Sequence, residues 1–304
     1  MPSTRRCFTS ALLLGTASVG AVVRPGAAQP LLPPDLRAQL LQARASAPPA
    51  VMRANPRAEM AFERTFGRVG EVAADLAAPR LILVNIAAAE AIAFEDGREV
   101  LRSRVIVGTP RNRTPQLVTF ATSVRCNPPW HVPASIIPEI RAAGGGAGFQ
   151  TVGARMIQPP GPNNPLGILR LGLLDSDGIF LHGTNRPALF QREGRALSHG
   201  CVRVERIREF CAWMLDISPA ALQNYVSTGR TIELHPLRDV QVVLAYFSAW
   251  PDSAGRLVIH PDPYGLDAPG ARRAGFRRIL RNAPDDPLEV EAAARATLAA
   301  TPRI

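Results

Sequence analysis

The chain has 304 residues, of which 46% are hydrophobic and 20% charged, a composition typical of a globular protein with one or two domains. Its formal net charge is +10, and all 35 basic residues are arginines, which excludes a Schiff-base lysine and a P-loop phosphate ligand. The positive charge favours binding to an anionic polymer or surface. The arginines are spread along the chain, however, and no nucleic-acid-binding motif is present, so we expect no nucleic-acid partner.

The N-terminus has the features of an export signal. An Arg5-Arg6 pair precedes an apolar stretch at 11–23, and small residues follow up to Ala28. We therefore predict a twin-arginine-type signal peptide over 1–28 and a protein of the periplasm or cell envelope. The apolar stretch is too short for a stable membrane span, so we expect none after cleavage; the alternative is an uncleaved anchor.

Residues 29–79 are predicted to form a linker and a short helical preface. Apolar residues recur at helical spacing over 35–44 and 57–76, and prolines separate these two stretches. We expect a small helical unit here and not an independent catalytic domain.

From residue 80 the pattern changes to short apolar runs typical of strands, with an Asp96-Gly97 turn between two of them. The clearest predicted helix covers 204–215, which has one apolar stripe, and Ser218 is the predicted N-cap of a second helix that ends at Gly229. Many strands and few helices predict a mainly β domain over 80–264, followed by an Arg-, Pro- and Ala-rich tail over 265–304 with one helix at 288–299. The predicted strands are 81–86, 91–95, 99–107, 116–124, 151–157, 167–171, 178–182, 231–234, 240–247 and 256–260, and a short helix is expected at 135–142.

Three cysteines remain after removal of the predicted signal: Cys126, Cys201 and Cys211. An odd number in an oxidising compartment leaves at least one thiol free or paired with another chain. Cys126 and Cys211 form one possible pair, which would leave Cys201 free. Cys211, however, lies on the apolar stripe of the predicted helix, which favours a buried thiol there.

Cys201 lies in the most informative segment of the chain. Fifteen residues, beginning with Gly183, separate His182 from the segment Ser198-His199-Gly200-Cys201-Val202-Arg203. A thiol attacks a carbonyl only as the thiolate, and a histidine within hydrogen-bond reach can take its proton. We predict that His182 is this base, that a helix starting just after Cys201 favours the thiolate, and that the backbone amides of 199–201 form an oxyanion hole.

Two other interpretations of these residues stay open from spacing alone. His182, His199 and Cys201 are possible metal ligands, but they lack a CxxC or HxxxH pair and an evident fourth ligand, so no metal site is predicted. The second alternative is a purely structural arrangement of the two histidines around the cysteine.

The pattern of a histidine, a fifteen-residue gap, then Ser-His-Gly-Cys, an apolar residue and arginine resembles the signature of the YkuD-type L,D-transpeptidases. The resemblance covers about 80–264 and is closest to the branch with the larger enterobacterial enzymes. Further segments that are similar to this family, in the same order, are 81–86, 105–108, Thr114-Pro115, 127–133, 158–167 and 179–182.

The resemblance implies a β-sandwich with the catalytic cysteine on a loop that leads into a helix. Cys201 would attack the carbonyl after the third residue of a peptidoglycan stem peptide and expel D-Ala. His182 would be the base, oriented by the backbone carbonyl of Gly183, and His199 and Gly200 would shape the oxyanion pocket with Cys201.

The amine of a second stem peptide would then resolve the thioester, without metal or organic cofactor. The resemblance further implies that carbapenems acylate Cys201. Arg203 would bind a substrate carboxylate or brace the loop.

Other candidate substrate contacts are Ser198, Trp130 and Asn185, although Trp130 is equally well explained as a packed loop residue. Several acceptors fit the same acyl-enzyme: a second stem peptide, water, a free D-amino acid or a lipoprotein lysine. Cleavage at another stem position and a non-catalytic wall-binding protein are the remaining alternatives. The oligomeric state stays open.

Overall fold

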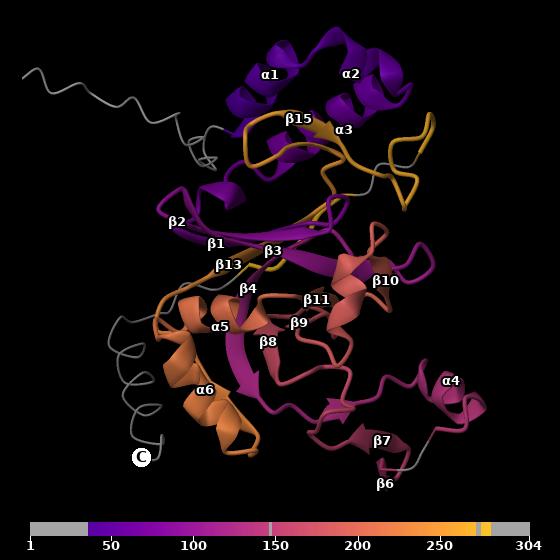
Figure 1. The fold of residues 1–304 in the computed structure, drawn as a ribbon, viewed down its shortest axis with the longest axis vertical. Helices are drawn as coiled ribbons and strands as arrows, with labels where there is room; N and C mark the ends of the chain where they lie inside the picture. The colour runs from indigo at the N-terminus through magenta and orange to yellow at the C-terminus, as the bar shows by residue number, and fades with distance from the viewer. Residues whose placement is uncertain (1–35, 146–147, 272–274, 281–304) are drawn as a thin grey trace, which may run out of the picture.

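The computed structural model describes residues 36–145, 148–271 and 275–280 (Figure 1). The predicted signal over 1–28 and the helix predicted at 288–299 lie outside these residues. Within the described ranges, none of the helices is both long enough and apolar enough to cross a membrane.

The fold is mainly β. Eleven strands form one sheet in the order β10-β3-β11-β9-β8-β4-β13-β1-β2, with β12 and β16 paired to β4. Because β3 pairs with both β11 and β2, the sheet bends round and closes on itself. Its strands are β1 Arg80–Asn85, β2 Glu90–Glu95, β3 Arg98–Gly108, β4 Leu117–Cys126, β8 Leu169–Leu173, β9 Leu181–His182, β10 Ala196–Ser198, β11 Val202–Val204, β12 Ile232–Leu234, β13 Gln241–Ala245 and β16 Arg277–Arg278.

Two small sheets and a few helices complete the molecule. The small sheets are β5-β7-β6 and β14-β15. Their strands are β5 Trp130–His131, β6 Gln150–Val152, β7 Arg155–Gln158, β14 Ala249–Pro251 and β15 Leu257–Ile259. The helices are α1 Leu36–Ser46, α2 Pro49–Ala54, α3 Ala58–Glu71, α4 Ile137–Ala142, α5 Ile207–Met214 and α6 Pro219–Ser227, with 3-10 turns η2 Asp75–Ala77 and η3 Pro187–Gln191.

The main core lies inside the closed sheet, where α5 contributes Phe210 and Met214 to the apolar cluster formed by the strands. The β2–β3 hairpin turns at Asp96 and Gly97, both with positive φ, which matches the twist of two-residue hairpin loops. β1 is buried along its whole length because β13 pairs with it in parallel on one side and its two faces contact different clusters.

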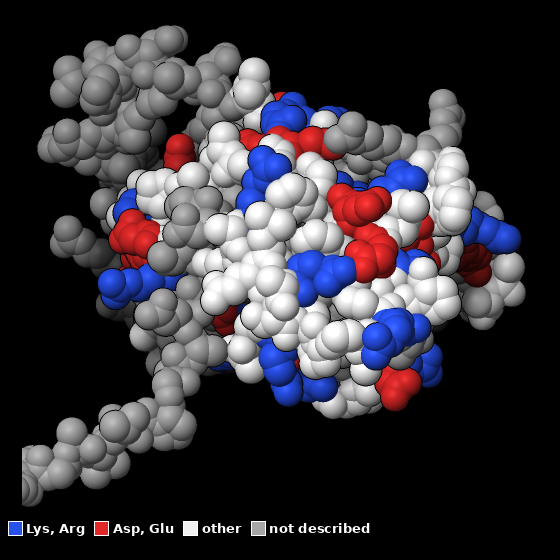
Figure 2. All heavy atoms as spheres, turned by 90° about the horizontal axis from the view of Figure 1, so that it is seen from above, with Lys and Arg blue, Asp and Glu red and all other residues white. Residues whose placement is uncertain are grey.

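The helical preface packs on the outer face of this sheet. Leu40 of α1 and Val69 of α3 join Leu83, Phe94 and other outward-facing strand residues in a second cluster. On the face of the molecule seen from this end, arginines and acidic residues are interspersed and form no single basic patch (Figure 2).

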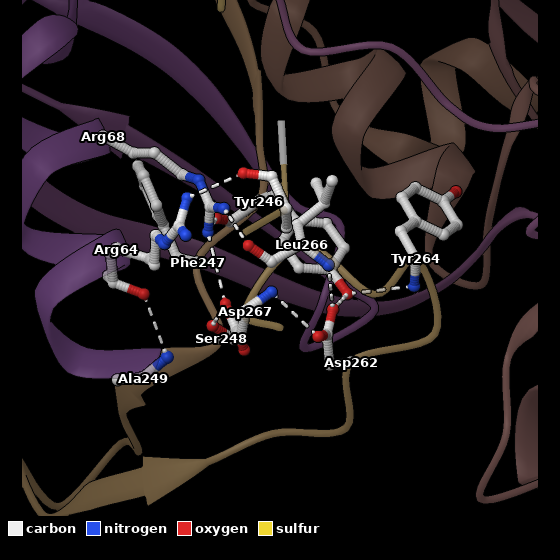
Figure 3. Close-up of polar contacts among 12 residues, drawn as sticks. Arg64, Arg68, Tyr246, Phe247, Ser248, Ala249, Asp262, Tyr264, Leu266 and Asp267 are labelled. Atoms are coloured by element: carbon white, nitrogen blue, oxygen red, sulfur yellow. Dashed lines mark hydrogen bonds and ion pairs between the residues drawn. The ribbon is translucent and has the colours of Figure 1, made fainter. Parts of the chain in front are cut away.

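A buried carboxylate fastens α3 to the segment after β15 (Figure 3). Asp267 is 1% exposed and accepts hydrogen bonds from Arg57 (2.6 Å) and Ser248 (2.9 Å). Arg68 lies 3.6 Å from the same carboxylate and donates to the carbonyl of Tyr246 at 3.0 Å. The preface is therefore held by charge as well as by apolar contact.

Three element predictions were wrong. The helix expected over 204–215 begins only at Ile207, since 202–204 pair as β11 between β9 and β3. The strand expected over 151–157 is a hairpin, β6–β7, that turns at Gly153 with φ +58°. A separate helix, α2, lies between the two expected in the preface, and the second of these, α3, ends at Glu71.

Candidate active site

Strand register brings the predicted base into a row of charged residues. His182 on β9 lies opposite Arg170 of β8 and Arg203 of β11. The row continues through Arg125 of β4 to Glu233 of β12. Residues directly opposite one another share a face of the sheet, so we call these five the arginine–histidine row.

Cys201 is next to this row. It directly precedes β11, and the amide of the following residue, Val202, donates to the carbonyl of Phe180, the residue just before β9 (2.9 Å). Its Sγ donates to the carbonyl of Gly178 at 3.5 Å. The cysteine and the histidine are thus carried by adjacent parallel segments whose separation is fixed by backbone hydrogen bonds.

The Cys201 thiol is partly buried, and this burial raises its pKa above the usual range. A backbone hydrogen bond at Phe180 and the positive charges of Arg203 and Arg170 oppose the rise without cancelling it. No helix begins beside Cys201, because β11 follows it, so the predicted helix-dipole contribution is absent. The thiol therefore needs a base to reach the thiolate.

His182 is 4% exposed, and its Nδ1 lies 2.7 Å from the carbonyl oxygen of Gly183. Since a carbonyl only accepts, this contact assigns the proton to Nδ1 and leaves the Nε2 lone pair as the proton acceptor. Burial lowers the pKa of His182 to about 4, helped by Arg203 and Arg170 and opposed by backbone carbonyls of Gly183 and Leu166. The imidazole is neutral at pH 7.

The loop before Cys201 is held by its own side chains. Ser198 is buried; its hydroxyl donates to the carbonyl of Cys201 (2.5 Å) and accepts from the amide of Gly200 (3.1 Å). That amide is engaged and does not point at a substrate, which corrects its predicted place among the oxyanion donors. The amides of Cys201 and His199 stay as candidates.

Gly200 instead supplies backbone shape. Its φ of +117° is in the region that L side chains rarely adopt, and a Cβ there would lie 3.3 Å from Ile179 Cδ1. The sharp turn before Cys201 therefore depends on glycine.

A residue that carried no assigned role in the sequence, Thr114, supports this turn. Its side chain is buried; Oγ1 donates to the carbonyl of Gly200 (2.7 Å) and accepts from the amide of Gly108 (2.9 Å). The hydroxyl of Tyr264 in turn accepts from the Thr114 amide (3.0 Å) and donates to the Gly108 carbonyl (2.8 Å). The Thr-Pro pattern was the only sequence signal for it.

The other predicted site residues border the site through different elements. His199 Nε2 lies 3.2 Å from a carboxylate oxygen of Glu139 on α4. Trp130 packs edge-on against Phe149, with ring centroids 6.3 Å apart. Asn185, which is exposed, donates to the carbonyl of Asn163 at 3.0 Å.

The remaining cysteines are free, buried thiols, and no disulfide joins Cys126 to Cys211. Burial raises the pKa of Cys126 to about 11, and raises that of Cys211 further. Among the described residues, no three His, Cys, Asp or Glu side chains are grouped so as to hold a metal ion. Of the three described cysteines, only Cys201 is partly exposed.

Comparison with known proteins gives one family. The family model YkuD, L,D-transpeptidase catalytic domain, matches residues 79–243. A Haemophilus influenzae protein described as "Putative L,D-transpeptidase" is 31% identical over 217 residues, which cover 61% of this chain and 44% of that protein. "Probable L,D-transpeptidase YcfS" of Escherichia coli is 27% identical over 124 residues, 40% of this chain and 35% of that one. The chain thus spans less than half the length of these relatives.

Solved structures with a similar chain trace include two L,D-transpeptidases. That from Mycobacterium smegmatis has a TM-score of 0.31 at 15% identity and covers 55% of this chain and 59% of its own. L,D-transpeptidase 3 from Mycobacterium tuberculosis has a TM-score of 0.31 at 13% identity, and the match covers 55% of this chain and 61% of that one.

Proposed function

Because this chain belongs to the YkuD family of L,D-transpeptidase catalytic domains, we propose that it cross-links peptidoglycan stem peptides through a thioester on Cys201. The observation that carries the proposal is the placement of Cys201 and a neutral His182 on adjacent segments inside the matched region. A neutral imidazole with a free nitrogen and a partly exposed thiol are the two groups that acyl transfer requires.

In the proposed reaction, His182 Nε2 accepts the thiol proton while Sγ adds to the carbonyl between the third stem residue and D-Ala. The amides of Cys201 and His199 stabilise the oxyanion. The C–N bond breaks, the imidazolium returns its proton to the leaving amine, and free D-Ala departs. The amine of a second stem peptide then attacks the thioester, losing a proton to His182, and Cys201 is regenerated as the thiol.

The surrounding residues have supporting roles in this proposal. The Gly183 carbonyl holds the tautomer of His182, and Ser198 with Gly200 shapes the loop that presents Cys201. Arg203, Trp130 and Asn185 contact the peptide in this proposal. Trp130 of β5 packs against Phe149, and Asn185 donates to the carbonyl of Asn163. Only the side chains and backbone take part in these steps; a metal or organic cofactor has no role in them.

We further propose the organisation and location of the protein. Residues 1–28 export it by the twin-arginine route to the periplasm, 29–79 form the preface, 80–264 carry the activity and 265–304 form a tail. The preface would then be a structural brace, which its packing on the outer face of the sheet supports.

Product analysis tests the activity and separates the acceptors. The mature protein and its Cys201→Ala variant are incubated with purified disaccharide-tetrapeptide, and the products are fragmented by mass spectrometry. We expect a dimer lacking one D-Ala, formed only by the wild type, with the new bond on the third residue of the donor. Tripeptide alone would identify water as acceptor, and exchange of D-Ala for an added D-amino acid would identify that acceptor.

Absence of every product would contradict the proposal, and full cellular function of Cys201→Ala would support the wall-binding alternative.

A further inference from the structure

Two arginines of the arginine–histidine row differ from the others in the body of the protein. Among the described residues, the side chains of Arg170 and Arg203 have no hydrogen bond or ion pair, and the Nε atom of each is buried without a partner. An unpaired buried donor costs free energy that an exposed arginine avoids by binding water. The described arginines that do have a carboxylate partner are Arg44, Arg57, Arg68, Arg80, Arg102, Arg104, Arg125, Arg206, Arg238, Arg256, Arg277 and Arg278.

These two guanidinium groups flank the reacting side chains. Arg170 and Arg203 are the direct neighbours of His182 on its two sides. Both interact electrostatically with the Cys201 thiol and with the imidazole. Positive charge is therefore gathered on both sides of His182 and close enough to Cys201 to act on its thiol.

The fold holds Arg170 in this position without neutralising it. Its guanidinium lies 4.3 Å from the centroid of the ring of Phe180, the residue just before β9. The nearest carboxylate along the row belongs to Glu233, which is paired with Arg125 and also accepts from Ser123 at 2.7 Å. Glu233 is thus committed elsewhere, and Arg170 stays available to an incoming anion.

For Arg203 the family resemblance already implied a substrate carboxylate or a bracing role. We propose that Arg170 joins Arg203 in one carboxylate subsite, and that this subsite binds the terminal carboxylate of the residue expelled from the donor peptide. The inference rests on the proposed function. In that donor, the terminal carboxylate is separated from the scissile carbonyl only by the amide nitrogen and one α-carbon. A carboxylate so close to the bond attacked by Cys201 lies within reach of both guanidinium groups, whose planar forks suit it.

Binding there also prepares the base. The positive charges of Arg203 and Arg170 depress the pKa of His182, and a bound carboxylate offsets them, so the imidazole accepts the Cys201 proton more readily. When the C–N bond breaks, the expelled amino acid removes this carboxylate again. The subsite thus couples recognition of the correct peptide end to activation of the thiol.

The test compares two donors that differ only at the peptide end: disaccharide-tetrapeptide with a free carboxylate and with a terminal carboxamide. The wild type should prefer the carboxylate by about 10–100-fold in kcat/KM, the value of one charge-assisted hydrogen bond. Arg170→Met should lose most of this preference by slowing the carboxylate donor alone, and Arg170→Lys should keep part of it. Arg256→Met, which removes a highly exposed arginine beside β15, is the matched control and should behave as the wild type.

A second measurement separates the subsite from the reaction. Binding of both donors to Cys201→Ala, measured by calorimetry, needs no turnover. The subsite predicts that the carboxamide donor binds more weakly than the carboxylate donor, and that adding Arg170→Met removes this difference in affinity. Such a result supports the subsite even if no product forms and the proposed function fails. Equal binding of the two donors, or an equal loss of both rates in Arg170→Met, would overturn the inference while leaving transpeptidation intact.

Discussion

Replacing Thr114 with valine tests how the turn before Cys201 is held. Thr114 is 3% exposed, so Thr114→Val keeps the shape of a buried side chain and removes only its hydroxyl. The amide of Gly108 and the carbonyl of Gly200 each lose a partner, at 2.9 and 2.7 Å. Each unsatisfied buried polar group costs about 1–3 kcal/mol, so we expect the free energy of unfolding to fall by about 2–6 kcal/mol.

The same change should also slow acylation. The Gly200 carbonyl is held one residue before the proposed nucleophile, and displacing a reacting group by about 1 Å costs on the order of 10²-fold in rate. We therefore expect Thr114→Val to be acylated by a carbapenem about 10–100-fold more slowly, measured by intact mass against time at a temperature where the variant is folded.

Thr119→Val is the matched control for both effects. Thr119 is fully buried on β4, which is not paired with β10 or β11, and donates to the carbonyl of Leu174 at 2.6 Å. It should lose about 1–3 kcal/mol of stability in urea and keep the wild-type acylation rate. If Thr114→Val is acylated at the wild-type rate, or loses less than about 1 kcal/mol of stability, the Thr114 hydroxyl does not hold the turn before Cys201.

Two further predictions concern stability. Asp267→Asn leaves the guanidinium of Arg68 buried without its counter-charge, so the free energy of unfolding in urea should fall by about 3–5 kcal/mol. Asp252→Asn, at the ion pair with the exposed Arg256, should lower it by less than about 1 kcal/mol, and equal losses would contradict a stabilising role for the buried Asp267. Folding lowers the pKa values of His182 and His260 from 6.5 to about 4, so the unfolded chain binds protons that the folded chain excludes. The contribution of these histidines to the free energy of unfolding should therefore be fully present above pH 6.5. It should be lost as the pH drops toward 4, by up to about 3 kcal/mol per histidine. His260→Gln should remove about half of this slope; an unchanged slope would contradict the assignment.

Where local interactions decide an element, the sequence predicted it. The hairpin at Asp96-Gly97 forms because those two residues adopt positive φ, and Ser218 caps α6 by accepting from the amide of Ala221 at 3.0 Å. The mainly β architecture was also predicted, since strand-like apolar runs recur through the central part of the chain. These features depend on neighbours within a few positions, which a sequence displays directly.

Where tertiary pairing decides, the sequence misled. Val204 continues the apolar stripe of α5 and was predicted as the first residue of that helix, but the backbone of 202–204 pairs with β9 and β3 and forms β11. The predicted dipole at Cys201 failed for that reason. The hairpin at Gly153 was missed because one run of strand-forming residues does not show where it reverses.

The candidate site shows the same division. The motif containing His182 and Cys201 was visible because its residues stand close together in the chain. Arg170 gained its place only through register across β8, β9 and β11, and Thr114 through hydrogen bonds to residues on three other segments. No periodicity in the sequence carries such information.

We propose that Cys201 is the nucleophile and His182 its base, and mapping of the acyl-enzyme tests both roles. A carbapenem is incubated with the wild type, Cys201→Ala and His182→Ala, and the adduct is located by peptide mass spectrometry. Opening of the β-lactam adds the whole reagent, so we expect that full mass on the peptide containing Cys201 and no adduct in Cys201→Ala. Labelling of His182→Ala should be about 10²–10⁴-fold slower than that of the wild type. An adduct on another residue, or labelling of His182→Ala at the wild-type rate, would contradict it.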